Sequence, residues 1–491
     1  MCYKMPKTLF IVLRQMPGGL FVLVAYGAQD VMLTGNPSEN FFKHVYRTHV
    51  HLAKEPIQNT PVNAFDSPEN NRTTESRFKI KRSGDYINEM NLLINLPAIR
   101  VPQGSTYQFR WANLPGLAMI EEAKIIIGGT EVQVLDRDRI FSLYKLDYPQ
   151  EKATIFEKMV GNLPELVDPN NGPYARISSE TYPYTTDDDE FSLPGKQLCI
   201  PLPFWFSKDT QLSLPVGFLQ YHEVELVLKI APYTQWIQVR ETSQDEWIAP
   251  PADYDITEYF VTFGRNWGMN PRIECLYYIL PDEERIKLAK TEINVPVFRM
   301  REYIEYTQRN NFIYNPRATP GQSFVATDTV NFLLRQESNP IRRFILIPRR
   351  VDFLDANNWT RLGNWDTIDY ARDTSGFVLP YSDRIADNFT FRVNGNPVVE
   401  ELRADYLGEY DTFKFSHGQG ESGLLSYSFG IVNAPIKSTG TVNLGRIREP
   451  TITLKTTPVD IAPSVYSVKL LVECVNWFKF QDGYGGLAYS T

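Results

Sequence analysis

Few stretches of this 491-residue chain place reactive side chains at a spacing that could do chemistry. Residues 418–423 read Gly-Gln-Gly-Glu-Ser-Gly, which fits the GxGxxG pattern that holds a pyrophosphate. That function requires a strand before the glycines and a helix after them, within a βαβ unit. Here β-type patterns lie on both sides of the motif. The sequence therefore favours a structural loop over a nucleotide site.

Two other groups of side chains suggest metal binding, but neither has the spacing that a metal requires. Residues 187–190 are three Asp and one Glu in a contiguous run, whereas a calcium loop alternates its ligands along the chain. His49 and His51 would share one face of a strand, yet no Cys or carboxylate stands nearby at ligand spacing. We interpret the acidic run as a solvated loop and the two histidines as structural, and we predict no metal site.

Catalytic motifs are equally scarce. The chain contains no GxSxG, HExxH or Walker A sequence. His222, flanked by Tyr221 and Glu223, stands at the start of a predicted strand. We expect this histidine to pack or to form a hydrogen bond rather than to catalyse. The sequence predicts no enzyme activity, no catalytic residue and no cofactor.

Composition indicates β-structure and argues against some classes of partner. The chain has 27 Tyr and 29 Phe, which favour strands, and 34 Pro and 29 Gly, which favour turns. A chain of this length needs more than one hydrophobic core. Its formal net charge of −8 disfavours direct binding of nucleic acid, which needs clustered Lys and Arg.

The cysteines and the N-terminus bear on the compartment. Cys2, Cys199, Cys275 and Cys474 are far apart and show no disulfide framework, so we expect a reducing compartment. Cys275 and Cys474 lie inside apolar strand patterns, where a free cysteine behaves as a small hydrophobic residue. The apolar run at residues 9–13 is short for a signal peptide and far too short to span a bilayer. We therefore expect no cleaved signal peptide.

One β-hairpin pattern occurs twice. Residues 121–136 read as a strand, a Gly-Gly turn and a second strand, and residues 387–402 read the same way around Asn-Gly. Both dipeptides suit the turns that match strand twist. A matching order of elements follows each hairpin: 204–207, 223–230 and 274–280 after the first, and 425–431, 450–456 and 467–475 after the second. The chain looks like one β-rich unit used twice.

Residues 223–230 give the clearest strand prediction. Val224, Leu226, Leu228 and Ile230 alternate with charged residues, which is the pattern of a half-buried strand. Leu226 should point between two sheets and Val227 should point the opposite way.

The chain divides into five predicted segments with different patterns. They are an N-terminal arm at 1–42, a first β-domain at 43–282, a charged linker at 283–292, a second β-domain at 293–478 and a Gly-rich tail at 479–491. The first domain should contain an amphipathic helix near residues 150–160. Residues 163–196 and 354–386 should be exposed loop excursions, because they are rich in polar and turn-forming residues.

Several segments, in order along the chain, resemble one known family. They are residues 16–20 (MPGGL), 24–30 (VAYGAQD), 33–37 (LTGNP), 41–43 (FFK), 45–47 (VYR), 80–85 (IKRSGD), 219–224 (LQYHEV), 427–429 (YSF), 440–447 (with Gly-Thr, Asn, Arg and Ile) and 485–489 (GGLAY). The chain resembles the major capsid proteins of nucleocytoplasmic large DNA viruses, the group that includes the algal chloroviruses. Residues 1–15 lie upstream of this resemblance, and residues 163–196 and 305–386 match poorly.

The resemblance implies an all-β fold of two consecutive eight-stranded jelly-roll β-sandwiches, with long loops and an N-terminal arm. It implies a structural protein whose homotrimers form pseudo-hexagonal capsomers that tile an icosahedral shell. The implied partners are other copies of the chain, minor capsid proteins and a nearby internal viral membrane, with no direct contact to nucleic acid. The implied location is the virion capsid, assembled in virus factories in the host cytoplasm.

Two sets of residues are candidates for contact and for modification. The arm residues that should contact neighbouring copies are Leu20, Val22, Val24, Tyr26, Gln29, Asp30, Asn36, Pro37, Phe41, Phe42, Tyr46 and Arg47. Asn71, Asn358 and Asn388 begin sequons, which matter only if the chain meets a glycosylation machinery.

A second function stays open on the residues alone, because jelly rolls also host lectins and hydrolases. Trp359, Trp365 and Tyr370, if exposed beside several Asp, could stack on a sugar. A glycoside hydrolase would need two carboxylates at a set separation. A tight trimer would favour the shell protein, and a monomer with affinity for glycans would favour the alternative.

Overall fold

The structure is a computed structural model, and the chain forms two compact units, Met1–His51 and Leu52–Thr491. The described residues are 36, 42, 48–63, 72–172, 182–186, 190–243, 246–251, 259–261, 268–307, 329–334, 337–364, 384–433, 439–457 and 465–489. All strands among them belong to the second unit.

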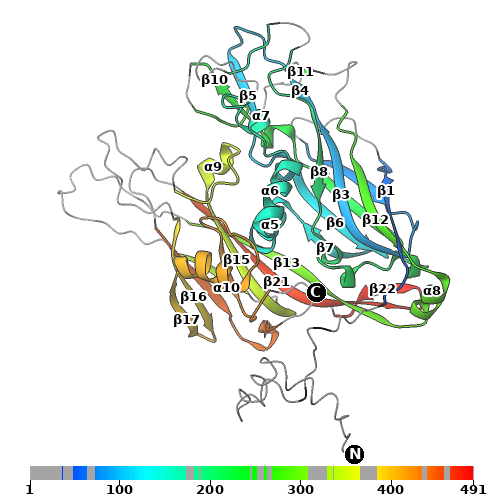
Figure 1. The fold of residues 1–491 in the computed structure, drawn as a ribbon. Coiled ribbons are helices and arrows are strands. Elements are labelled where there is room, and N and C mark those ends of the chain that lie inside the picture. Colours follow the sequence, from blue (N-terminus) through cyan, green and yellow to red (C-terminus); the bar gives the residue numbers. More distant parts are fainter. Residues whose placement is uncertain are drawn as a thin grey trace, which may run out of the picture. The chain divides into compact units, whose positions relative to one another are not determined.

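The first half of this unit is a sandwich of two four-stranded sheets, which we call the first jelly roll (Figure 1). One sheet has the strand order β1-β12-β3-β8 and the other β2-β9-β6-β7, with every pair antiparallel. The strands are β1 Ala53–Asn59, β2 Thr74–Lys79, β3 Tyr86–Leu96, β6 Ile120–Ile127, β7 Thr130–Leu135, β8 Lys196–Pro201, β9 Val224–Ile230 and β12 Arg272–Ile279.

The second half repeats this topology strand for strand, and we call it the second jelly roll. Its sheets have the orders β13-β21-β15-β18 and β14-β20-β16-β17. The strands are β13 Ile293–Tyr306, β14 Thr329–Leu333, β15 Pro340–Arg350, β16 Ala386–Val393, β17 Asn396–Arg403, β18 Leu425–Ser428, β20 Thr451–Thr456 and β21 Tyr466–Gln481. Two short strands, β19 Val442–Asn443 and β22 Tyr484–Leu487, extend the first of these sheets. The predicted double jelly roll is confirmed.

Both predicted hairpins are present, as β6-β7 and β16-β17. Each turn has positive φ at both central residues: 58° and 80° at Gly128 and Gly129, and 52° and 80° at Asn394 and Gly395. Such turns twist in the same sense as the strands that they join, and Gly and Asn reach positive φ at low cost.

The predicted match between residues 204–207 and 425–431 is wrong. Residues Trp205–Ser207 form a 3₁₀ turn, η1, that follows β8. The strand that occupies the place of β18 in the first jelly roll is β8, because each lies at the same edge of its sheet. Aromatic residues suggested a strand, but here they fill the core below a turn.

In each roll, helices lie between the fifth and sixth strands. Between β7 and β8 these are α5 Arg137–Asp147, α6 Gln150–Met159 and α7 Pro164–Val167, and between β17 and β18 they are the π-helix η7 Tyr406–Tyr410 and α10 Asp411–Phe415. The amphipathic helix predicted near residues 150–160 is α6. In the described part of the chain, no helix is both long enough and apolar enough to cross a membrane.

The remaining elements are short. They are β4 Ala98–Ile99, β5 Tyr107–Trp111, α4 Pro115–Ala118, η2 Thr210–Leu212, η3 Val216–Phe218, η4 Tyr233–Gln235, β10 Ile237–Glu241, β11 Phe260–Val261, α8 Asp282–Ala289, α9 Val351–Asp355 and η8 Leu444–Arg446. The pairs β4-β11 and β5-β10 form two small ladders beyond one end of the first sandwich (Figure 1). The charged segment between the two jelly rolls contains α8.

Strand β9 follows the predicted alternation, with one correction. Val224, Leu226, Leu228 and Ile230 all lie in the hydrophobic core. Val227 points away from that core, yet it is only 2% exposed. Its cross-strand neighbours are Arg77 on β2 and Lys124 on β6, whose long side chains share its face of the sheet. The expected lightly covered face is therefore wrong at this position.

The excursion at residues 163–196 is not simply an exposed loop. Tyr182 and Leu193 are buried in the core, and the Tyr182 hydroxyl accepts a hydrogen bond from the backbone N–H of Phe109 at 3.2 Å. Cys275 and Cys474 are buried in the cores of the first and second jelly rolls, as predicted.

Candidate functional site

The two jelly rolls share a sheet face. In β15 and β21, Phe344 and Leu470 face the core of the second roll, whereas Ile345, Ile347 and Leu471 belong to the core of the first. Successive side chains of a strand point to opposite faces, so this sheet is buried on both sides. The β1-β12-β3-β8 sheet of the first roll has one buried face by contrast. Burying a Leu or Ile side chain contributes about 1.5–3 kcal/mol, so the shared face holds the rolls together. We call it the joint.

A buried group of charges lies at the centre of the joint. Arg343 on β15 is fully buried and donates two hydrogen bonds to Asp147 of α5, at 2.8 and 2.9 Å. The same guanidinium lies 2.6 Å from Glu473 on β21. Lys208, just after η1, lies 3.4 Å from Glu473. The network therefore connects one helix and one turn of the first roll to two strands of the second.

Electrostatics keep this network ionised. Burial by itself would raise the pKa of Glu473, but Arg343 and Lys208 outweigh it and hold the pKa well below its usual range. Burial would likewise lower the pKa of Arg343, but Asp147 and Glu473 raise it. Removing one partner of such a pair is expensive because the other charge stays buried, whereas the intact pair contributes little net stability. The network therefore fixes how the rolls dock more than it strengthens the docking.

A second ion cluster lies at the other end of α5. The carboxylate of Asp138 lies 2.7 Å from Arg349 and 2.6 Å from Lys469, both on the second roll. Burial would raise the pKa of Asp138, but Arg349 and Lys469 lower it overall. Asp136 caps the helix by accepting a hydrogen bond from the backbone N–H of Arg139 at 2.8 Å. Helix α5 is thus held at both ends.

The GxGxxG loop of residues 418–423 docks on the last turn of α5. Gly418 and Gly420 donate their backbone N–H groups to the carbonyl oxygens of Leu146 and Lys145, at 2.7 and 2.9 Å. These carbonyls are among those that a helix end leaves without an internal partner. A Cβ atom on Gly418 would overlap the carbonyl oxygen of Lys145. The glycine is required for close backbone approach, and the motif joins the two rolls.

The C-terminal hairpin of β21 and β22 makes another contact between the two rolls. His222 Nδ1 lies 2.8 Å from the carbonyl oxygen of Gly485, and Tyr221 stacks on Tyr484 with ring centroids 4.7 Å apart. A Cβ atom on Gly485 would lie 2.7 Å from the ring of Phe478. The hydrogen-bonding role predicted for His222 is confirmed.

Residues of the IKRSGD segment complete this contact. Arg82 donates to the carbonyl oxygens of Gln220 and His222, each at 3.0 Å. Asp85 accepts a hydrogen bond from Arg285 of α8 at 2.8 Å and another from the backbone N–H of Leu280 at 2.8 Å. Three of the segments behind the family resemblance therefore meet, and one of them also holds the helix that connects the rolls.

Comparisons with known proteins agree with this geometry. Residues 40–256 match the family described as the major capsid protein N-terminus. The major capsid protein of Phaeocystis pouchetii virus is 26% identical, with 97% of this chain and 100% of the relative covered. That of Paramecium bursaria Chlorella virus 1 is 24% identical with the same coverage. The chain is similar to the major capsid proteins of large DNA viruses along nearly its whole length.

Solved structures of capsid proteins share the fold. A structure of the PBCV-1 virus capsid aligns with a TM-score of 0.65 at 18% identity, covering 92% of this chain and 100% of that one. The Faustovirus major capsid protein aligns with a TM-score of 0.61 at 14% identity, covering 96% and 98%. This capsid protein is thus a viral structural protein of the virion, and its relatives are shell proteins rather than enzymes.

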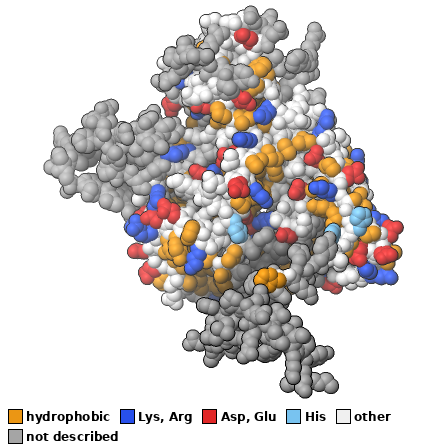
Figure 2. All heavy atoms as spheres, in the orientation of Figure 1, with side chains coloured by type: hydrophobic (Ala, Val, Ile, Leu, Met, Phe, Trp, Pro, Cys, Tyr) orange, Lys and Arg blue, Asp and Glu red, His pale blue; other side chains and the backbone are white. Residues whose placement is uncertain are grey.

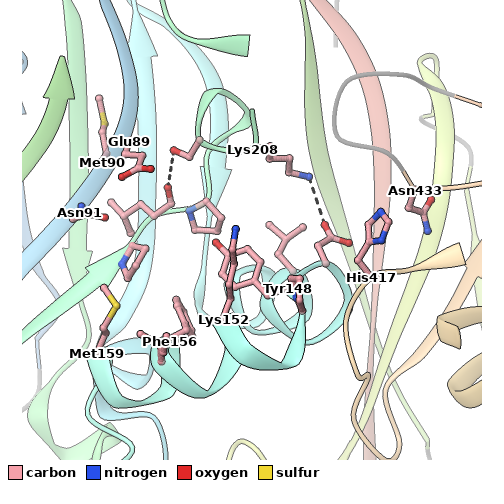
Figure 3. Close-up of a pocket in the computed structure, with 18 of the residues that line it drawn as sticks. Glu89, Met90, Asn91, Tyr148, Lys152, Phe156, Met159, Lys208, His417 and Asn433 are labelled. Carbon is pink, nitrogen blue, oxygen red and sulfur yellow. Dashed lines mark hydrogen bonds and ion pairs between the residues drawn. The ribbon is translucent and has the colours of Figure 1, made fainter. Parts of the chain in front are cut away.

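A pocket of about 470 Å³ opens beside the joint of the capsid protein (Figure 3). Met90, Phe156 and Met159 give it an apolar side, and Lys208 lies 3.8 Å from Asp147 on the other. No three His, Cys, Asp or Glu residues among those described are grouped so that they could hold a metal ion. The face shown in Figure 2 carries acidic and basic side chains interspersed, not the basic stripe expected of a nucleic-acid surface.

Most of the predicted arm lies outside the described residues of the capsid protein. Asn36 and Phe42 are described and exposed, and the Phe42 side chain is 99% exposed. The other predicted arm residues, which lie outside the described residues, are Leu20, Val22, Val24, Tyr26, Gln29, Asp30, Pro37, Phe41, Tyr46 and Arg47. Their role stays a prediction.

The three sequons differ in their surroundings. Asn388 is half-buried within β16 and donates a hydrogen bond to Asp387 at 2.9 Å. Asn358 is also half-buried, and Asn71 lies outside the described residues. Glycosylation at these positions stays a prediction.

The expected exposure of Trp359 is wrong. Its ring packs edge-on against Phe141 of α5, with centroids 5.5 Å apart, and its Nε1 donates to the carbonyl oxygen of Asn113 at 3.0 Å. It is 1% exposed and belongs to the joint. Trp365 and Tyr370 lie outside the described residues. The proposed sugar platform thus loses its one described aromatic residue.

Sequence reasoning missed the charged residues of the joint, although a signal exists. Arg342 and Arg343 lie between Ile341 and the apolar run that begins at Phe344 in β15, and Glu473 interrupts an apolar run in β21. A charge inside a run that reads as a buried strand is rare unless it is paired. Such interruptions in two strands of one sheet could have indicated a buried ion pair.

Proposed function

We propose that this capsid protein forms homotrimers that act as pseudo-hexagonal capsomers of an icosahedral virus shell. The joint is the observation that carries the proposal. Two jelly rolls of equal topology, held in one fixed relation, give each chain two similar wall segments. Three chains then supply six similar segments, so a three-fold particle can pack as a hexagon does.

Rigidity supports this role. Domains within one chain usually move relative to each other unless their interface is large and hydrophobic. Here apolar residues of both rolls form one continuous core, and buried ion pairs restrict the docking geometry. A shell subunit needs such a fixed shape, because small angular errors would accumulate across a lattice.

The arm and the partners belong to the same proposal. Residues 1–42 extend to neighbouring copies, where their apolar side chains are buried and lock adjacent capsomers. Assembled capsomers contact minor capsid proteins and lie over an internal viral membrane, and assembly takes place in virus factories in the host cytoplasm. The protein acts by geometry, without a chemical reaction.

Light scattering of the purified full-length chain tests the proposal. At micromolar concentration, the mass should be three times the chain mass of 56.5 kDa. Electron microscopy of the same sample should show particles with a hexagonal outline. An intact, folded sample that contains only monomers would overturn the proposed function.

A further inference from the structure

The second jelly roll has its own counterpart of α5. Helix α5 lies between β7 and β8. The equivalent place in the second roll, between β17 and β18, holds η7, which continues directly into α10. This helix carries Tyr406, Tyr410 and Phe413, which are 36%, 44% and 86% exposed. Spacings of four and three residues place them on one side of a helix. We call these three residues the aromatic stripe.

The surface that α5 covers also has a counterpart. Helix α5 of the first roll packs on the β13-β21-β15-β18 sheet of the second roll, where Arg343, Ile345 and Glu473 are fully buried. The equivalent β1-β12-β3-β8 sheet of the first roll turns one face outward, with Leu93 and Leu276 half-buried. We call this outward surface the open face. Among the described residues, α6 contacts this sheet at its edge strand β8, and the second roll has a helix with exposed aromatic residues.

We propose that the aromatic stripe of one copy packs on the open face of a second copy. This contact would repeat, between chains, the one that α5 makes within the chain. The inference rests on the proposed homotrimer and names its interface. It is a head-to-tail contact between two different surfaces, which gives a closed ring when the rotation between neighbours closes.

The chemistry of the two surfaces favours a second copy as the occupant. Glu409 and Lys414 flank the stripe, and both are exposed. On the open face, Leu93 lies opposite Arg272, and Leu276 lies opposite Glu89. Both surfaces therefore combine apolar residues with charges of both signs, as interfaces do when the separate chains must stay soluble. Within the chain, the equivalent helix α5 already packs on the equivalent β13-β21-β15-β18 sheet.

A segment next to α10 carries another exposed apolar residue. Asn433 donates its backbone N–H to the carbonyl oxygen of Phe415 at 3.0 Å, which brings the end of the neighbouring segment beside α10. In that segment Ile431 is 74% exposed.

Phe413→Asp in the full-length chain tests the interface. A buried aromatic anchor at an interface usually contributes enough that its loss weakens association at least about thirtyfold. Sedimentation analysis should show such a rise in the dissociation constant of the trimer. Ile286→Asp, at a residue of α8 that is 57% exposed, is the matched control and should leave it within about twofold. Both variants should melt like the wild type, because both side chains are exposed.

Cross-linking identifies the surface that receives the stripe. A photoreactive benzophenone side chain at position 413, in a mixture of isotope-labelled and unlabelled copies, should link to peptides of β3 or β12 on the other copy. Links to other elements, or an unchanged dissociation constant for Phe413→Asp in a trimeric protein, would overturn this interface and leave the proposed function standing. A wild-type chain that is monomeric would overturn both.

Discussion

The environment of a single residue in this capsid protein depends on which side chains pack on its face of the sheet. Leu226 and Val227 are neighbours on β9, and both are buried. Leu226 belongs to the apolar core, whereas Val227 lies between Arg77 and Lys124 of the adjacent strands. Equal burial therefore hides two different environments, one without charges and one between two cations.

Aspartate at these two positions should have different effects. Leu226→Asp would place a carboxylate in the core without a partner, and we expect a loss of more than about 4 kcal/mol in the free energy of unfolding. Val227→Asp would place it between two cations, and we expect a loss of about 1–2 kcal/mol. Denaturant unfolding and soluble yield of the two variants measure this. A larger loss for Val227→Asp would mean that the strand is read in the wrong register.

The buried carboxylates make stability depend on pH. The pKa values of Glu473 and Asp138 are lowered in the folded protein. Their stabilisation is therefore present above the unfolded pKa values and is lost as pH falls toward the folded ones. The free energy of unfolding should decrease as pH is lowered from about 5 to about 3, because the unfolded chain takes up protons that the folded chain does not.

Glu473→Gln is the control for this pH dependence. The variant should be less stable at pH 7, because the buried Arg343 loses the charge of Glu473, one of its two carboxylate partners. Its melting temperature should also change less between pH 5 and pH 3 than that of the wild type, since one shifted group is gone. Parallel curves for the two proteins would contradict the role given to Glu473.

At the scale of elements, helix α5 does most to connect the two rolls. Its N-terminal end contacts Arg349 and Lys469 through Asp138. Its C-terminal end receives the glycine loop, and its last residue, Asp147, pairs with Arg343. A motif known for nucleotides thus serves here as a contact between two backbones, because both uses need glycine where a side chain would not fit.

Gly418→Ala should weaken the joint. The added methyl group would overlap the carbonyl oxygen of Lys145, so the loop must move and its hydrogen bond to Leu146 is lost. We expect a loss of about 1–3 kcal/mol in the free energy of unfolding. Gly486→Ala, where nothing lies within 4 Å of the added Cβ, is the control and should change it by less than about 0.5 kcal/mol. Similar losses in both variants would show that the loop adapts.

At the scale of the whole molecule, the joint leaves one surface on each roll for contact with other copies, the open face on the first and the aromatic stripe on the second. The rolls have the same topology, but in the part of the chain that the structure describes, core residues of the other roll pack on the outer sheet face of the second roll, and Leu93 and Leu276 on that of the first are half-buried. An assembly that covers the other face must come from outside the chain. The arm and the aromatic stripe are the two candidates for such contacts, and they act at different levels, between capsomers and within one.

Deletion of residues 1–42 separates these levels. We expect both rolls to stay folded, because the described core consists of later residues. Thermal melting should therefore resemble that of the full-length chain. Assembly into shells, followed by electron microscopy, should be weaker because the arm no longer reaches neighbouring capsomers. Normal shells from the truncated chain would show that the arm is dispensable.

The sequence by itself determined the features that depend on neighbouring residues. The hairpin turns follow from Gly128-Gly129 and Asn394-Gly395, and the inward face of β9 follows from alternation. The repeat of the hairpin pattern predicted that one β-rich unit occurs twice. Turn geometry and side-chain alternation act over a few residues, so short stretches encode them fully.

Only the tertiary structure decided how the rolls meet. Trp359 lies in a predicted loop, but its ring packs against Phe141 of the other roll. The glycine motif is interpreted as a structural loop, but its hydrogen bond to the carbonyl oxygen of Leu146 in α5 could not be predicted. These partners are more than 200 residues apart in the chain, since 359 − 141 is 218 and 418 − 146 is 272. Burial and pairing across such separations depend on how the two rolls dock, which no local pattern encodes.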